Sequence, residues 1–287
     1  MNKNKLLYLL ILLLILPCMV GCNNDYTTIN SDYERLYYKY PIRLEEDSYP
    51  QVAQKHCYTY YHYSGMKETG NLILYYNYDT SMDLCFLDYM MISFLKGKIK
   101  VSVIDIGGKT QSNIEEMTFQ ILDDCREKDS SNPVYIAGIP SPRMNSGSKE
   151  SKKLIKKYPN KFDGLILYGD TLSKKYDFSD MDIKVFCMYG SNDNIVTPQD
   201  IEDSKIYYPS YSKFFEIEGA NHTNMHFQKE SRIKDDEHYN EFISVPGPLD
   251  NKDFEATISL TEQIDSLSNA TIDFLYKVGI EEGTNND

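Results

Sequence analysis

Short apolar segments of strand character alternate with amphipathic segments along most of this chain, and this alternation restricts its fold more than any other feature. The strand-like runs lie at 71–76, 99–105, 134–137, 164–168, 185–189 and 214–218, and a weaker run at 58–63 is expected to form an early edge strand. The spacing of apolar residues predicts helices over 84–95, 113–127, 148–158, 198–204 and 258–278. Such alternation predicts βαβ units, and therefore an α/β fold with a mostly parallel central sheet flanked by helices.

The first 22 residues predict export and attachment to a membrane. Lys3 and Lys5 supply a positive start, residues 6–16 form a run of eleven apolar residues, and Met19-Val-Gly-Cys22 follows. Because a transmembrane helix needs about 20 residues, the run is interpreted as the apolar core of a signal peptide. Small or apolar residues directly before a Cys resemble the bacterial lipobox, in which Cys22 receives diacylglycerol. The alternative is an ordinary secretory signal in which Cys22 is an incidental thiol.

The charge balance of the chain argues against nucleic acid and anionic lipid headgroups as partners. The chain carries 43 acidic and 30 basic residues. Removal of residues 1–21 would take away Lys3 and Lys5 and leave 28 basic residues, so the mature charge would be 28 − 43 = −15. A surface of this sign repels phosphate groups.

Four cysteines follow Cys22 in the chain: Cys57, Cys85, Cys125 and Cys187. Cys85 and Cys187 lie in apolar runs and are expected to be buried thiols. The sequence contains no CxxC pair and no Cys/His ligand cluster, so we predict neither a metal site nor a cofactor. Whether any of the four forms a disulfide is not decided by the sequence.

Two strand-like runs in the second half of the chain each end in a polar turn with one titratable side chain. Val185-Phe-Cys-Met-Tyr-Gly-Ser-Asn-Asp193 ends in Asp193, and Phe215-Glu-Ile-Glu-Gly-Ala-Asn-His222 ends in His222. Loops at the carboxyl ends of parallel strands form the rim of an active site. We therefore expect Asp193 to lie within hydrogen-bond reach of His222, which would act as general base. The alternative is that Asp193 only bonds the backbone of its own turn.

Five short motifs follow one another in the second half of the chain: Tyr158-Pro-Asn-Lys-Phe-Asp-Gly-Leu165, Tyr189-Gly-Ser-Asn-Asp193, Glu218-Gly-Ala-Asn-His222, Gly247-Pro248 and Ala256-Thr-Ile-Ser-Leu-Thr-Glu-Gln263. In this order they resemble a bacterial α/β-hydrolase family from Asn132 onward. Ordered matches are more specific than any one of them. The resemblance implies the α/β-hydrolase fold and makes Asp193 and His222 the last two members of a catalytic triad. Asn221 and Thr223 are expected to shape the His222 loop.

These observations divide the chain into three parts. A lipoprotein signal peptide is predicted at 1–21, a tether and N-terminal segment at 22–50, and a single α/β-hydrolase-like domain at 51–280. After removal of residues 1–21 the chain has 287 − 21 = 266 residues, the size of one large α/β domain. The long insertion 228–253 is expected to pack over the mouth of the cleft.

The nucleophile elbow of the family has no direct counterpart here, because the chain contains no Gly-x-Ser-x-Gly. In its place stands Ala137-Gly-Ile-Pro-Ser-Pro-Arg-Met-Asn-Ser-Gly-Ser148. Alignment of the preceding strand puts Pro140 at the nucleophile position, with Ser141 one residue later. Counting back from the later motifs puts Asn145 there instead, next to Ser146.

Two functions from different classes follow. The first is a serine hydrolase, lipid-anchored through Cys22 on the extracytoplasmic face of the bacterial cell membrane, that acts on an ester or amide of an unidentified small molecule. Its nucleophile would be Ser141, with Ser146 as the alternative, and His222 and Asp193 would be the acid–base pair. The second is a catalytically inactive α/β-hydrolase fold that binds a ligand at the surface.

Two departures from the family favour the inactive alternative, whereas the intact acid–base pair favours the enzyme. Pro142 directly follows Ser141 and has no N–H to donate to an oxyanion. The Pro-Gly-Gly oxyanion loop of the family is replaced by Tyr76-Asn-Tyr-Asp79.

Overall fold

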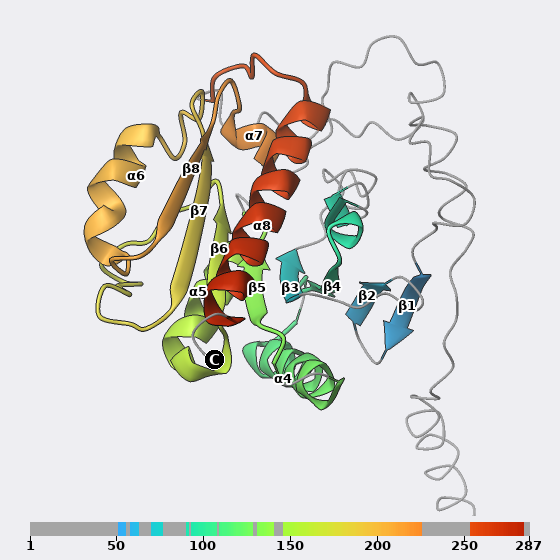
Figure 1. Ribbon diagram of the computed structural model, residues 1–287. Coiled ribbons are helices and arrows are strands. Elements are labelled where there is room, and N and C mark those ends of the chain that lie inside the picture. The colour runs from blue at the N-terminus through green and yellow to red at the C-terminus, as the bar shows by residue number, and fades with distance from the viewer. Residues whose placement is uncertain are drawn as a thin grey trace, which may run out of the picture.

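A computed structural model of the chain describes residues 51–55, 58–62, 70–76, 90–91, 93–107, 109–128, 131–140, 146–225 and 253–283 (Figure 1). Several predicted features lie outside these residues, namely the signal peptide, Cys22, the tether, Cys57, Cys85, Ser141 and almost all of the 228–253 insertion. Among the described residues, no helix is long and apolar enough to cross a membrane.

One sheet of eight strands runs through the described part of the chain. The strands are β1 (Gln51–Lys55), β2 (Tyr58–His62), β3 (Gly70–Tyr76), β4 (Ile99–Asp105), β5 (Val134–Gly138), β6 (Gly164–Tyr168), β7 (Lys184–Gly190) and β8 (Lys213–Ile217). Their order across the sheet is β1-β2-β4-β3-β5-β6-β7-β8. The pairs β1–β2 and β2–β4 are antiparallel, and every neighbouring pair from β4 to β8 is parallel. The predicted mostly parallel sheet is confirmed.

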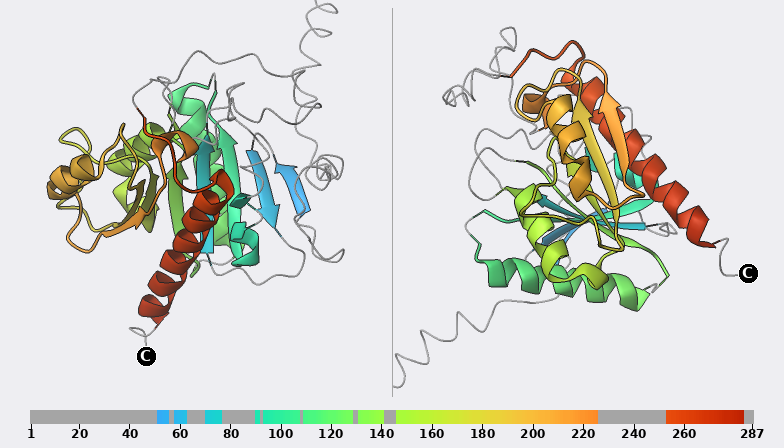
Figure 2. Two further views of the ribbon diagram at one scale, coloured as in Figure 1. Left: turned by 90° about the horizontal axis from the view of Figure 1, so that it is seen from above. Right: turned by 90° about the vertical axis from the view of Figure 1, so that its left-hand side faces the viewer.

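Helices cover both faces of the sheet, so the molecule has three layers (Figure 1 and Figure 2). On one face α8 (Leu260–Gly283) packs beside the helical residues 90–91 and 93–96, and on the other lie α4 (Gln111–Lys128), α5 (Gly147–Lys157) and α6 (Pro198–Ser204). Successive residues of β3 alternate between these layers. Leu72 packs on the α8 side and Ile73 on the α4 side. Burial on both faces is why the strand has a continuous apolar sequence.

The predicted early strand is present but does not lie at the edge of the sheet. β2 matches the run at 58–63, and β1 pairs with it on the outer side through contacts such as Gln51 with His62. The prediction of an edge strand at 58–63 was therefore wrong in its position. A five-residue strand can be held by backbone hydrogen bonds alone. β1 therefore needs no apolar run, and without such a run the sequence does not predict the strand.

Candidate active site

Asp193 and His222 meet at the carboxyl ends of neighbouring strands. Asp193 lies in the turn after β7, and His222 begins α7 (His222–Met225), a short helical turn after β8. His222 Nδ1 lies 2.8 Å from Asp193 Oδ2. The hydrogen bond predicted between these two side chains is therefore confirmed.

The second carboxylate oxygen of Asp193 holds the turn in which the residue lies. Oδ1 accepts the backbone N–H of Ile195 at 2.9 Å and that of Val196 at 2.7 Å. The alternative that Asp193 bonds only its own turn is therefore wrong, because one oxygen bonds the turn and the other bonds His222. The Asp193 side chain is 0% exposed and that of His222 is 12% exposed. An ionised carboxylate only accepts hydrogen bonds, so the tautomer that fits this contact carries its proton on Nδ1 and has Nε2 as its acceptor nitrogen.

Asn221 shapes the loop that presents His222, as predicted. Its side-chain oxygen accepts the Asn224 N–H at 3.0 Å, which starts the α7 turn, and its Nδ2 donates to the Phe254 carbonyl at 2.8 Å. Gln263 of α8 donates from Nε2 to the Asn221 carbonyl at 2.9 Å. The turn that carries His222 is therefore held in place by hydrogen bonds to Phe254 and Gln263.

Gly169, which follows β6, brings a third strand end beside His222. Its φ is +55°, a conformation that glycine adopts without steric cost. A Cβ there would lie 3.0 Å from Met225 Cγ and 3.6 Å from His222 Nδ1. The absence of a side chain lets the end of β6 approach the α7 turn closely.

The connection from β5 to α5 begins and ends on two glycines that touch each other. A Cβ on Gly138 would lie 2.0 Å from the carbonyl carbon of Gly147, and one on Gly147 would lie 2.2 Å from the Tyr75 carbonyl oxygen. The motif Gly-x-Ser-x-Gly has three residues between its glycines, whereas eight residues, 139–146, stand between Gly138 and Gly147. The alignment that places the nucleophile at Pro140 fits the Gly138 end of the connection, and the one that places it at Asn145 fits the Gly147 end. The connection has five more residues than the motif.

The sheet order and the placement of Asp193 beside His222 agree with a match over residues 144–238, about a third of the chain, to a family model described as "Alpha/beta hydrolase family". The chain has the α/β-hydrolase fold. No curated protein matches the sequence.

Several solved structures are similar to this α/β-hydrolase fold at low sequence identity. An alpha-beta serine hydrolase homologue from Coxiella burnetii is 14% identical, with 61% of this chain and 89% of that chain covered and a TM-score of 0.45. A predicted CIB-like hydrolase from Thermoplasma acidophilum is 14% identical, with 77% and 93% covered and a TM-score of 0.42. Dienelactone hydrolase from Anabaena variabilis is 11% identical, with 76% and 90% covered and a TM-score of 0.46.

The sequence predicts the nucleophile in the connection 139–146, between β5 and α5. Ser141 lies outside the described residues, so its placement near His222 stays a prediction. Ser146 directly precedes α5, is half-buried, and has an extended backbone with φ −75° and ψ 135°. Its hydroxyl does not cap the helix, whereas its carbonyl accepts the Glu150 N–H at 3.1 Å.

Cys187 and Ser148 also carry nucleophilic groups, and their surroundings exclude them from the role of nucleophile. Burial raises the pKa of the Cys187 thiol to about 12, so the reactive thiolate is not formed at neutral pH. Cys187 is thus the buried thiol that the sequence predicts. Ser148 is fully buried and donates its hydroxyl proton to Asp170 Oδ2. Within the described residues, no group of three or more His, Cys, Asp or Glu side chains is placed to hold a metal ion.

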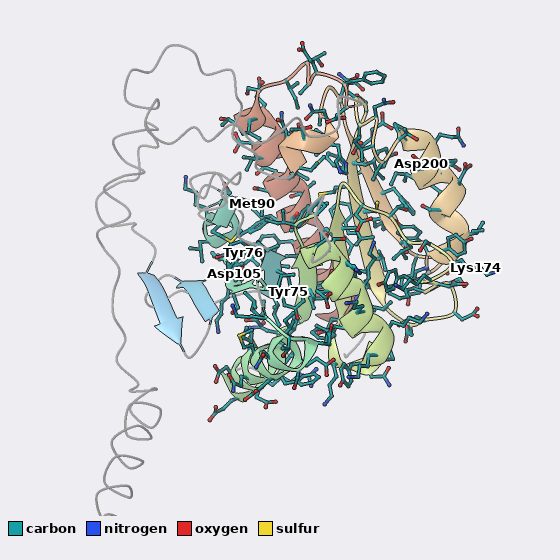
Figure 3. All side chains as sticks on the ribbon, turned by 180° about the vertical axis from the view of Figure 1, so that it is seen from behind. Tyr75, Tyr76, Met90, Asp105, Lys174 and Asp200 are labelled. Carbon is teal, nitrogen blue, oxygen red and sulfur yellow. The ribbon has the colours of Figure 1, made fainter. Side chains whose placement is uncertain are left out.

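The end of β3, which precedes the predicted position of the oxyanion loop, carries two aromatic side chains. Tyr75 and Tyr76 end the strand beside Asp105 of β4 (Figure 3). The Tyr75 phenol is buried and bonds Thr118 Oγ1 of α4, and its burial raises its pKa well above the ordinary value. This phenol is therefore neutral and hydrogen-bonded inside the core, so it takes no part in the site. Residues 77–79 lie outside the described ranges, so the altered oxyanion loop stays a prediction.

Asp253 is a further residue of the site, and the sequence does not single it out. Its Oδ2 accepts the Thr223 N–H at 2.8 Å and the Thr223 hydroxyl at 2.7 Å, and its Oδ1 accepts the Asn194 N–H at 3.2 Å. The predicted role of Thr223 in shaping the His222 loop is thereby confirmed. The sequence signal that points to Asp253 is its position three residues before the motif Ala256-Thr-Ile-Ser.

The close contact between Gly147 and β3 should contribute to the stability of the folded protein. We expect Gly147→Ala to lower the free energy of unfolding by about 2 kcal/mol or more, because the added Cβ would lie 2.2 Å from a backbone oxygen of Tyr75. Urea unfolding of the two proteins measures the difference. Gly70→Ala, on the strand β3 that carries Tyr75, is the control, since the nearest atom to a Cβ at Gly70 is 3.7 Å away. Equal losses in the two variants would show that the elbow glycines are not tightly packed.

Proposed function

We propose that this chain is a serine hydrolase, anchored by lipid at Cys22 on the extracytoplasmic face of a bacterial cell membrane, that cleaves an ester or amide bond of a small molecule. The observation that supports it most is the 2.8 Å hydrogen bond from His222 Nδ1 to a fully buried Asp193 carboxylate. That arrangement makes Nε2 a general base, and Asp193 stabilises the imidazolium formed when Nε2 takes up a proton.

The proposed reaction passes through a covalent acyl-enzyme. The Ser141 hydroxyl transfers its proton to His222 Nε2 while Oγ attacks the carbonyl carbon of the substrate. His222 then gives that proton to the departing alcohol or amine, and the acyl group stays on Ser141. A water molecule repeats both steps and releases the carboxylic acid, which restores the serine.

A second function is favoured by one specific observation, the five additional residues between Gly138 and Gly147. The sharp turn of the elbow exposes the nucleophile and places the next N–H for the oxyanion hole, and a longer connection does not impose that turn. Together with Pro142, this favours a catalytically inactive fold that binds a ligand at the cell surface.

Labelling with a fluorophosphonate separates the two functions without knowledge of the substrate. We expect slow formation of one covalent adduct on the full chain, because a missing oxyanion donor lowers the rate by about 10²–10³-fold. Intact-mass measurement should show that Ser141→Ala abolishes the adduct and that Ser146→Ala retains it. An adduct that persists in Ser141→Ala and disappears in Ser146→Ala would move the nucleophile to Ser146. If wild type forms no adduct even on long incubation, the serine hydrolase is excluded and the inactive fold remains.

A further inference from the structure

Asp253 joins the two loops that carry the acid and the base. Asn194, which donates its N–H to Oδ1, directly follows Asp193 in the chain. Thr223, which donates both its N–H and its hydroxyl to Oδ2, directly follows His222. One carboxylate thus spans the β7 turn and the α7 turn, with one oxygen bonded to each.

The segment around Asp253 makes further hydrogen bonds to the same two loops. Asn192 donates from Nδ2 to the Glu255 carbonyl at 3.2 Å, and the Thr257 N–H donates to the Gly219 carbonyl at 2.9 Å. The Phe254 carbonyl accepts from Asn221 at 2.8 Å. These partners use backbone groups of residues 253–257, whereas Asp253 contributes a charged side chain. Hydrogen bonds to a charged group are about twice as strong as those between neutral groups.

We propose that Asp253 is a positioning residue that holds His222 and Asp193 in register with each other. This proposal rests on the proposed function, because it assigns a role in the working of that acid–base pair. The two turns belong to different loops, and a displacement of about 1 Å between acid and base can cost on the order of 10²-fold in rate. The Asp253 carboxylate opposes such a displacement because each of its oxygens is bonded to a different turn.

Asp200 provides a matched control for the loss of these hydrogen bonds. Its Oδ2 accepts the N–H of Thr197 at 2.9 Å and the hydroxyl of Thr197 at 2.7 Å, the same two donor types that Thr223 offers to Asp253. Asp200 lies in the first turn of α6, where these bonds form the capping box of that helix. Removal of the Asp200 carboxylate therefore removes two hydrogen bonds of the same donor types without loosening the contact between the β7 turn and the α7 turn.

The test observes the hydrogen bond between His222 and Asp193 by NMR. The full chain, which contains five His residues, is labelled with ¹⁵N-histidine. The Nδ1 proton shared with Asp193 should give a far-downfield resonance in wild type that disappears in His222→Gln. We expect Asp253→Ala to speed the exchange of this proton with water by about tenfold or more. A factor of this size corresponds to the loss of one hydrogen bond to a charged group. Asp200→Ala should leave the exchange unchanged while it lowers the urea midpoint.

Each outcome of this test decides one claim. A wild-type protein without the resonance would overturn the acid–base pair, and with it the proposed function. A resonance that is present and exchanges equally in wild type and Asp253→Ala, or equally in both alanine variants, would overturn the positioning role alone. Asp253→Asn replaces Asp253→Ala if the alanine variant does not fold. Its single acceptor oxygen can serve only one of the two turns, so the same faster exchange is expected.

Discussion

Replacing Asp193 with Asn should lower the rate of fluorophosphonate labelling by about 10⁴-fold, because it forces His222 into the wrong tautomer. Asp193 Oδ1 is fixed by the N–H groups of Ile195 and Val196, so the amide oxygen of the variant must take that place. The amide NH₂ then faces His222 Nδ1 and requires it to accept a hydrogen bond. The proton moves to Nε2, which can no longer act as the base.

The measurement is the pseudo-first-order rate of adduct formation on the full chain, followed by intact mass. Asp200→Asn is the control, because the Asp200 carboxylate caps α6 by accepting the N–H and the hydroxyl of Thr197. It should label at the wild-type rate. Labelling of Asp193→Asn within tenfold of wild type would remove Asp193 from the chemistry, whatever the distance between the two side chains.

Replacing Cys22 with Ala should transfer the protein from the detergent phase to the aqueous phase, or leave an unprocessed chain of higher mass. The physical reason is that each buried CH₂ of an acyl chain contributes about 0.8 kcal/mol, so two chains on Cys22 hold a soluble domain on the membrane. Detergent partitioning of cells that express the full chain, followed by mass measurement, detects both results.

Cys18→Ala is the matched control, because Cys18 lies four residues before Cys22 within the segment expected to be removed. This variant should partition and be processed as wild type is. If Cys22→Ala keeps the wild-type mass and stays in the detergent phase, the lipid anchor is excluded and the alternative of an ordinary secretory signal gains support.

Local sequence predicted the elements of the sheet that are buried on both faces and the helix with a strong start. The predicted strands 99–105 and 164–168 have the bounds of β4 and β6, because an apolar run ends where the strand leaves the core. The predicted helix 198–204 has the bounds of α6. Thr197 directly before the helix and Asp200 in its first turn form a capping box that fixes where the helix begins. The strand pattern also placed Asp193 and His222, because neighbouring parallel strands end at one edge of the sheet.

The tertiary structure alone decided the features that depend on contacts between distant residues. The packing of Gly138 on Gly147, and of Gly147 on the Tyr75 carbonyl, showed that the two ends of the connection between β5 and α5 meet, which neither alignment of the sequence could establish. Asp253 lies 59 residues from Asn194 and 30 from Thr223. No periodicity links such positions, since hydrogen bonds between loops depend on how the chain returns to the sheet and leave no repeating pattern in the sequence.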